Sequence, residues 1–107
     1  MLDFLHFRRR MSSWLAAEAN DRSRSCQKAV ERTKKAIKKL ILSEEQAKRF
    51  FEVELNYQKE KKTIREMYFH LPDVRDEEMQ ALSVRKLEEM KSLLDANQWA
   101  LYRVESI

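Results

Sequence analysis

One nine-residue pattern occurs twice in the chain, at residues 42–50 and 94–102, and it strongly constrains the fold. Both copies read Leu-[Ser/Asp]-x-x-Gln-x-x-x-aromatic. The fixed positions are Leu42, Ser43, Gln46 and Phe50 in the first copy and Leu94, Asp95, Gln98 and Tyr102 in the second. A serine or aspartate followed by a glutamine three residues later is typical of a capping box, in which the two side chains satisfy free amides at a helix start. The pattern therefore predicts helices that begin near residues 43 and 95.

The composition favours helices in the rest of the chain as well. Its 107 residues include no glycine and one proline, and 37% of them are charged. Turns that need positive φ are therefore expected at residues such as Asn20 and His70. No alternating β-branched run is long enough for a pair of strands. We expect one all-α domain, residues 1–107, with four to five helices in an open helical hairpin or bundle, either alone or as a homodimer.

Apolar periodicity and helix-breaking residues predict where the helices lie. The expected helices cover residues 3–19, 22–41 and 43–68, then residues from Asp73 onward, and finally a short helix that starts at Asp95. His70, Leu71 and Pro72 should end the third helix, and Asp73 should cap the fourth. The expected breaks are therefore near Asn20, near Leu42, at residues 70–73 and near Asp95.

Each predicted helix has an apolar face. The first carries Phe4, Phe7, Met11, Trp14 and Leu15, and the second carries Cys26, Ala29, Val30, Thr33, Ile37, Leu40 and Ile41. The third carries Phe50, Val53, Tyr57, Ile64, Met67 and Tyr68, the fourth Met79, Leu82, Leu87, Met90 and Leu94, and the last Trp99, Tyr102 and Val104. These faces are expected to pack together, because every helix of a small bundle must bury one.

The third helix has a wider apolar face than one neighbouring helix covers, because Phe51 and Leu55 fall outside its central stripe. A second contact is therefore expected, with another helix, a dimer mate or a protein client. Methionine adapts to varied partners, although in a helical stripe it is more often core. The candidates for partner binding are Phe51, Leu55, Met67 and Met79.

Charge is distributed unequally along the chain. Residues 1–41 carry eleven Lys and Arg against four Asp and Glu, a net charge of +7, whereas residues 42–107 carry eleven against fourteen, a net charge of −3. The favoured interpretation is that the basic N-terminal helices lie along the acidic remainder, within one fold or across a dimer. The alternative is that the split steers an external partner.

A basic face on the second predicted helix suggests nucleic-acid binding as one alternative. Its residues are Arg32, Lys34, Lys35, Lys38 and Lys39. Lysine and arginine neutralise phosphates, but this face has no interleaved aromatic residue to stack on a base, and the chain has no recognisable helix-turn-helix. We therefore favour a solvated or acid-facing basic face over a nucleic-acid site.

The N-terminal helix suggests peripheral membrane contact as another alternative. Phe4, Phe7 and Trp14 could enter an anionic membrane surface while Arg8, Arg9 and Arg10 face the head groups. Packing of the same stripe on the other helices is the favoured interpretation. No apolar run is long enough for a membrane span or for the core of a signal peptide, which as written predicts a cytoplasmic chain.

Residues that could carry catalysis or bind a cofactor are not arranged in any known pattern. His6 and His70 have no partners at the spacing of a zinc site, and without glycine there is no phosphate-binding loop. Cys26 is alone, and its position on an apolar helix face predicts a buried side chain. We expect a non-enzymatic protein with no metal and no cofactor.

Residues Ile41 to Glu105 resemble the Spy/CpxP group, small bacterial envelope-stress proteins with LTxxQ repeats. The resemblance rests on the two boxes, on Phe50 to Tyr57 with Lys61 to Glu66, and on Ala100 to Glu105. The second box departs from the family pattern, with Asp95 for the usual threonine and Asn97 for the usual glutamate.

This resemblance implies a stress sensor or ATP-independent chaperone. Such a protein would form a dimer of bent helical hairpins whose concave face binds protein clients. The resemblance also implies work in the bacterial envelope, outside the cytoplasm, if the given start is not the native one.

Overall fold

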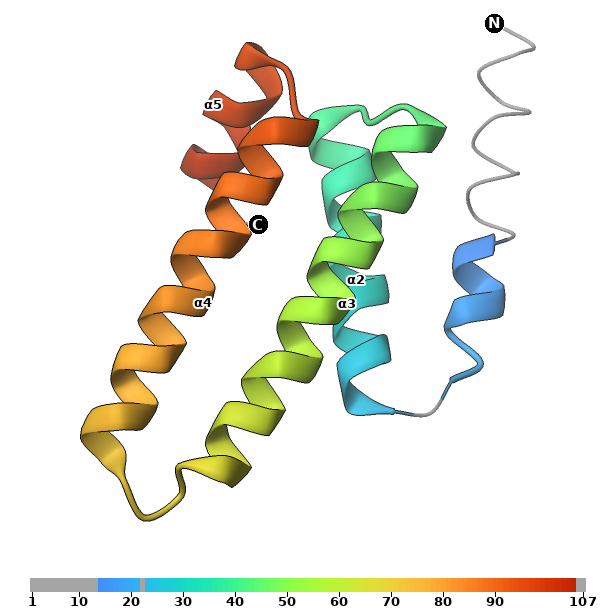
Figure 1. Cartoon of the computed structure of the whole chain (residues 1–107). Coiled ribbons are helices and arrows are strands. Elements are labelled where there is room, and N and C mark those ends of the chain that lie inside the picture. The colour runs from blue at the N-terminus through green and yellow to red at the C-terminus, as the bar shows by residue number, and fades with distance from the viewer. Residues whose placement is uncertain (1–13, 22, 106–107) are drawn as a thin grey trace, which may run out of the picture.

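The computed structural model describes residues 14–21 and 23–105, and these residues form an all-α fold (Figure 1). A helical stretch at residues 14–18 precedes α2 (Arg24–Leu40), α3 (Glu44–Met67), α4 (Pro72–Leu93) and α5 (Ala96–Glu105). No strand occurs in this described part of the chain. The predicted fold class is confirmed, and the breaks between helices lie where they were predicted. Most of the first predicted helix, residues 3–13, lies outside the described residues.

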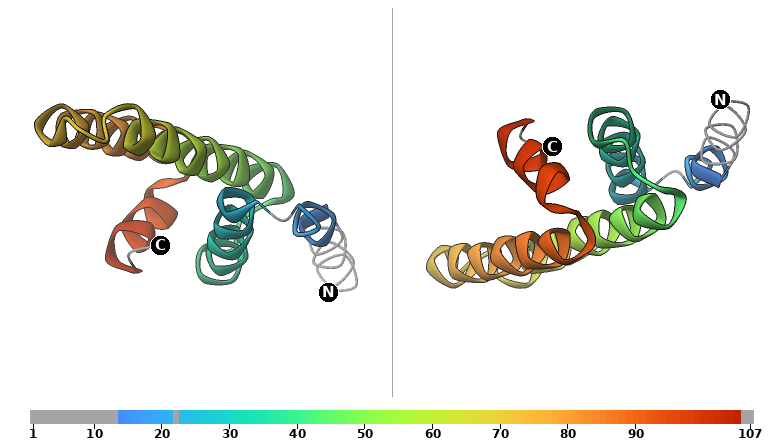
Figure 2. Two further views of the ribbon diagram at one scale, coloured as in Figure 1. Left: turned by 90° about the horizontal axis from the view of Figure 1, so that it is seen from below. Right: turned by 90° about the horizontal axis from the view of Figure 1, so that it is seen from above.

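The long helices α3 and α4 form an antiparallel hairpin that makes one layer of the molecule (Figure 1). α2 packs against α3, α5 packs against α2, and both lie on the same side of the hairpin (Figure 2). This second layer covers only the part of the hairpin where α3 begins and α4 ends. The molecule is therefore flat and elongated, with extents of 54 × 32 × 18 Å.

The larger core cluster lies where α2, α5 and the covered part of the hairpin meet. Its buried members are Ala36, Leu40, Leu42, Ala47, Phe50, Met90, Leu93, Leu94 and Tyr102. The rings of Phe50 and Tyr102 meet edge-on, with their centroids 6.1 Å apart, which is a favourable geometry for aromatic pairs. These two rings are the aromatic positions of the two sequence boxes, so the repeated pattern converges in the core.

A second core cluster attaches residues 14–18 to α2 and α3. Its buried members are Leu15, Cys26, Ala29, Val30 and Phe51. Trp14 meets Phe51 edge-on at a centroid distance of 5.7 Å. The prediction of a buried Cys26 is confirmed, and its thiol donates a hydrogen bond to the carbonyl oxygen of Glu18 at 3.3 Å. Burial raises the pKa of this thiol.

The start of α4 differs from the prediction that Asp73 caps it. α4 begins at Pro72, and its N-cap is Leu71, whose side chain makes no capping hydrogen bond. Proline suits the first helical position, because it lacks the N–H that would otherwise need a partner and its φ already matches a helix. Asp73 lies in the first turn, where its carboxylate interacts favourably with the positive end of the helix dipole.

The end of α2 corrects two further predictions. Ile41 has φ 53° and ψ 60°, in the left-handed region, and no other described non-glycine residue has positive φ. Asn20 and His70, which were expected to take this conformation, do not. Ile41 was also predicted on the apolar face of the helix, yet it is 73% exposed. The chain must turn within three residues to bury Leu42 and place Ser43 at the next N-cap, and it has no glycine for this position.

Some residues of the predicted apolar stripes are exposed instead of buried. They are Met67 on α3, Leu87 on α4 and Val104 on α5. α4 packs mainly against α3, so only a narrow part of its surface is covered. The stripes were therefore predicted too wide for those parts of the helices that no other helix covers.

Candidate functional site

Both sequence boxes form the helix caps that were predicted. At the start of α3, the Ser43 hydroxyl accepts a hydrogen bond from the Gln46 N–H (3.1 Å), and Gln46 Oε1 accepts one from the Ser43 N–H (3.0 Å). At the start of α5, Asp95 Oδ1 accepts from the Gln98 N–H (2.8 Å), and Gln98 Oε1 accepts from the Asp95 N–H (3.0 Å). Each box therefore satisfies two amides at a helix start.

The two glutamine side chains also bond to each other, which the sequence pattern alone did not predict. Gln46 Nε2 donates to Gln98 Oε1 at 2.7 Å, and Gln98 Nε2 donates to Gln46 Oε1 at 3.2 Å. The same Nε2 groups donate to the carbonyl oxygens of Leu93 (3.0 Å) and Leu40 (3.3 Å), at the ends of α4 and α2. Carbonyls at helix ends lack an intrahelical partner. The paired boxes thus join the starts of α3 and α5 to the ends of α2 and α4.

The structure separates the four partner-binding candidates. Phe51 is buried beneath Trp14, and Leu55 is half-buried against the same cluster. The wide face of the third helix is therefore covered by another helical segment of the same chain, and Phe51 is not available to a partner. Met79 is half-buried, whereas Met67 is 65% exposed.

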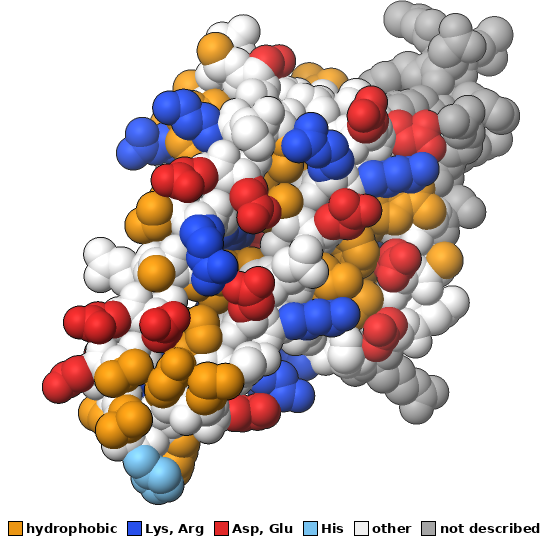
Figure 3. Space-filling model, in the orientation of Figure 1, with side chains coloured by type: hydrophobic (Ala, Val, Ile, Leu, Met, Phe, Trp, Pro, Cys, Tyr) orange, Lys and Arg blue, Asp and Glu red, His pale blue; other side chains and the backbone are white. Residues whose placement is uncertain are grey.

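Met67 belongs to an exposed apolar group at the turn between α3 and α4, which we call the hairpin tip. The hairpin tip comprises Met67, Phe69, Leu71 and Val74. Phe69 is 69% exposed, and its ring meets the ring of His70 edge-on at 4.8 Å. Figure 3 shows hydrophobic side chains gathered at this end of the molecule, next to a histidine. Sequence analysis selected only Met67, although apolar residues on both sides of a helix-breaking proline were a usable signal.

A groove of about 240 Å³ lies beside the hairpin tip. Its lining residues are Glu60, Thr63, Ile64, Met67, Tyr68, Glu78 and Arg85. Ile64 is buried and Tyr68 half-buried, while the charged residues are exposed. An apolar floor with a charged rim is typical of surfaces that bind other proteins.

The predicted basic face of α2 is not a single outward surface. Arg32 turns inward, and its Nε lies 3.1 Å from Glu54 Oε1. Lys39 forms an ion pair with Glu105 at 3.2 Å, while Lys34, Lys35 and Lys38 are exposed. These ion pairs join the basic residues 1–41 to the acidic residues 42–107, in agreement with the favoured interpretation of the charge split.

Glu54 is the centre of a buried charge cluster that sequence analysis missed. Its side chain is fully buried, and its Oε1 lies 2.9 Å from Lys86 Nζ and 3.1 Å from Arg32 Nε. Lys86 Nζ also lies 4.2 Å from the centre of the Tyr57 ring. The cluster therefore links α2, α3 and α4. Its sequence signal was the four-residue spacing from Phe50, which places a glutamate on the buried face of α3.

Two side chains at this cluster, Lys86 and Tyr102, have shifted pKa values. Burial lowers the pKa of Lys86, and the nearby Glu54 carboxylate opposes this effect. Burial raises the pKa of Tyr102 to about 12; the negative charge of Glu54 adds to the increase, and Arg32 opposes it. Lys86 therefore loses its proton more readily than usual, while the Tyr102 hydroxyl holds its proton to higher pH.

Features of a metal site or a membrane span are not found in the described residues. Within residues 14–21 and 23–105, no three His, Cys, Asp or Glu side chains gather closely enough to hold a metal ion. None of the described helices combines the length and apolar character needed to cross a lipid bilayer.

Comparisons of the chain with protein-family models, with curated proteins and with solved structures find no match.

Proposed function

We propose that this chain is a non-enzymatic helical protein that binds partly unfolded protein clients through the hairpin tip. This would be the role of a stress sensor or ATP-independent chaperone, as the resemblance to the Spy/CpxP group implies. The observation that carries the proposal is the solvent exposure of Met67, Phe69 and Leu71 at the end of the hairpin. Exposed apolar groups of this kind mark sites of interaction with other proteins.

The surroundings of the hairpin tip favour a client that carries both apolar and charged groups. Apolar side chains of a client would cover Phe69 and Met67, while its charged groups would meet Glu60, Glu78 and Arg85 at the rim of the groove. Unfolded chains expose both kinds of group along one segment. A second copy of this chain is the competing occupant, and the test below separates the two.

The membrane alternative has less support from the packing. Leu15 is buried, and Trp14 packs edge-on against Phe51. These two members of the N-terminal stripe are therefore engaged in the core of the protein. The other members, Phe4, Phe7 and Met11, lie outside the described residues.

Light scattering of an unfolded test protein, diluted from denaturant with and without the full chain, tests the proposal. We expect the wild-type chain to suppress aggregation and a variant with Met67→Ser and Phe69→Ser to suppress it several-fold less. Leu71 is left unchanged in this variant, because a serine at its N-cap position would also change the stability of α4.

Val104→Ser is the matched control, since Val104 is 79% exposed and α5 lies at the opposite end of the molecule (Figure 1). This control should behave like the wild type. An equal loss in the control, or a wild-type chain that does not suppress aggregation, would contradict the proposal. Sedimentation of the chain alone identifies a dimer, and a dimer abolished by the two tip substitutions would assign the hairpin tip to self-association.

A further inference from the structure

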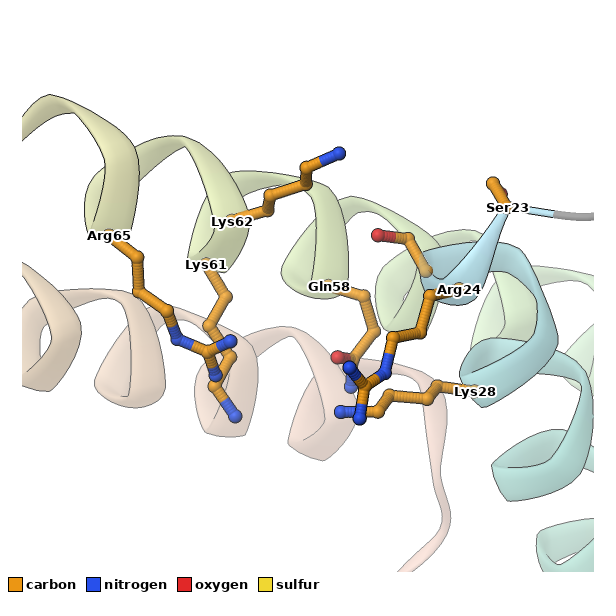
Figure 4. A pocket seen from close by; sticks show the side chains of 8 residues that line it. Ser23, Arg24, Lys28, Gln58, Lys61, Lys62 and Arg65 are labelled. Carbon is orange, nitrogen blue, oxygen red and sulfur yellow. The ribbon is translucent and has the colours of Figure 1, made fainter.

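A cavity of about 370 Å³ lies between the N-terminus of α2 and the second half of α3 (Figure 4). It is lined by Ser23, Arg24, Ser25 and Lys28 on one side and by Gln58, Lys61, Lys62 and Arg65 on the other. Five of these eight residues are cations and none is acidic. In Figure 4, Arg24 and Lys28 extend from α2 toward Gln58, and Lys61 and Arg65 lie side by side further along α3.

None of the five cations in this cavity forms an ion pair with another described residue. Elsewhere in the described chain, Arg32, Lys39, Lys48, Arg85 and Lys86 each pair with a glutamate. Like charges around one cavity repel each other. Burial lowers the pKa of Lys61, and the charges of Arg65 and Arg32 add to this effect. The Glu54 carboxylate opposes this effect on Lys61, but within the described residues no carboxylate forms an ion pair with any of the five cations.

The start of α2 adds hydrogen-bond donors to these charges. The Ser23 hydroxyl caps the N–H of Cys26, and the first turn of this 17-residue helix contains no acidic residue. The amides of Arg24 and Ser25 precede the first intrahelical hydrogen bond of α2, so they have no carbonyl partner within the helix. Backbone amides at such a position favour anions, because the helix dipole adds to their attraction.

We propose that this cavity binds a small polyanion that carries two or more phosphate groups. A single phosphate would leave most of the five cations without a partner, whereas a chain of phosphates can contact both α2 and α3. No aromatic residue lines the cavity, so it offers no ring on which a nucleic-acid base could stack. This inference is independent of client binding at the hairpin tip.

Isothermal titration of the full chain with inorganic tripolyphosphate tests this inference. The variant Lys28→Gln with Lys61→Gln removes one cation from each side of the cavity. We expect its affinity to fall by about tenfold or more, because charge-assisted hydrogen bonds to phosphate are lost. The control Lys34→Gln with Lys38→Gln removes the same net charge from exposed positions of α2 outside the cavity, and its affinity should change by less than about twofold.

Nuclear magnetic resonance of the wild type should place the largest shift changes on the amides of Ser25 and Gln58. Binding to vesicles that contain a bisphosphorylated inositol lipid, if it is lost in the cavity variant and displaced by tripolyphosphate, would identify a lipid head group as the phosphate source. A wild-type chain that does not bind tripolyphosphate would overturn the inference, and so would equal losses in the two variants. Tighter binding to duplex DNA that is unaffected by the cavity variant would also overturn it in favour of a nucleic-acid surface.

Discussion

At the scale of single residues, Glu54 shows how a charged side chain can be buried without being isolated. Removing a carboxylate from water costs several kcal/mol, and attraction to cations must offset this cost. Arg32 and Lys86 supply that attraction from two different helices. Buried pairs of this kind are a weak source of net stability, but removing one partner leaves the others uncompensated. We therefore interpret the cluster as a device that specifies how α2, α3 and α4 dock.

Glu54→Gln should lower the free energy of unfolding by about 3 kcal/mol, because it leaves Arg32 and Lys86 without their counterion. Urea denaturation followed by circular dichroism measures the change. The control is Glu52→Gln on the same helix, where the side chain is exposed and an effect below about 0.5 kcal/mol is expected. Equal stability of Glu54→Gln and the wild type would show that the negative charge of Glu54 does not contribute to the stability of the fold.

Ile41 provides a second prediction at this scale. A β-branched residue in the left-handed region costs about 1–2 kcal/mol relative to glycine, and little apolar burial is lost on its removal because the side chain is exposed. Ile41→Gly should therefore raise the free energy of unfolding by about 1 kcal/mol. Lys38→Gly, inside α2, should lower it by about the same amount. Destabilisation by Ile41→Gly would mean that the isoleucine side chain makes a contribution beyond its backbone conformation.

At the scale of helices, hydrogen bonds connect the two boxes into one unit. Each box caps its own helix through local hydrogen bonds, and the contact between Gln46 and Gln98 connects the two helix starts. The same two side chains satisfy carbonyls at the ends of α2 and α4. The order of the helices in space is therefore supported by polar side chains as well as by the apolar core.

A double-mutant cycle on Gln46→Ala and Gln98→Ala measures the interaction energy between the two boxes. Each single substitution should destabilise the protein, and the two should be non-additive by about 1 kcal/mol, because either one alone already breaks the shared hydrogen bonds. Ser43→Ala and Asp95→Ala remove only the caps and should each cost about 1 kcal/mol. Strict additivity of the glutamine substitutions would show that the two boxes act as separate caps.

At the scale of the whole molecule, one part of the hairpin formed by α3 and α4 packs against other helices, and the other part does not. The radius of gyration is 15.2 Å, larger than the roughly 13 Å of a compact domain of this length. α2 and α5 cover one part of the hairpin, and the other part extends as a two-helix arm that ends in the hairpin tip (Figure 2). Segments with few buried apolar contacts open locally at low free energy.

Hydrogen exchange should therefore be uneven along α3 and α4. Amides of residues 62–67 and 76–81, in the arm, should exchange through local opening, many times faster than amides of residues 50–54 and 90–93 beside the core. Mass spectrometry or nuclear magnetic resonance measures this difference. Uniform protection along the whole hairpin would indicate that another surface, such as a second copy of the chain, covers the arm.

The amino-acid sequence by itself determined approximately where the breaks between the described helices lie and that both boxes are caps. These features depend on groups within about four residues of each other, such as Ser43 with Gln46 and Asp95 with Gln98. Local preference misassigned two residues. Asp73 was predicted as an N-cap, but Pro72 before it already starts the helix. Ile41 was predicted on an apolar helix face, but the sharp turn that buries Leu42 leaves Ile41 exposed.

Only the tertiary structure decided which side chains from distant segments meet. Gln46 and Gln98 lie 52 residues apart, and Glu54 has its partners on two other helices. Burial of Phe51 and exposure of Met67, two apolar residues on the same helix, likewise depend on which part of α3 the other helices cover. Helical periodicity identifies the face of a helix that can be buried, but the packing of the remaining helices determines how much of that face is buried.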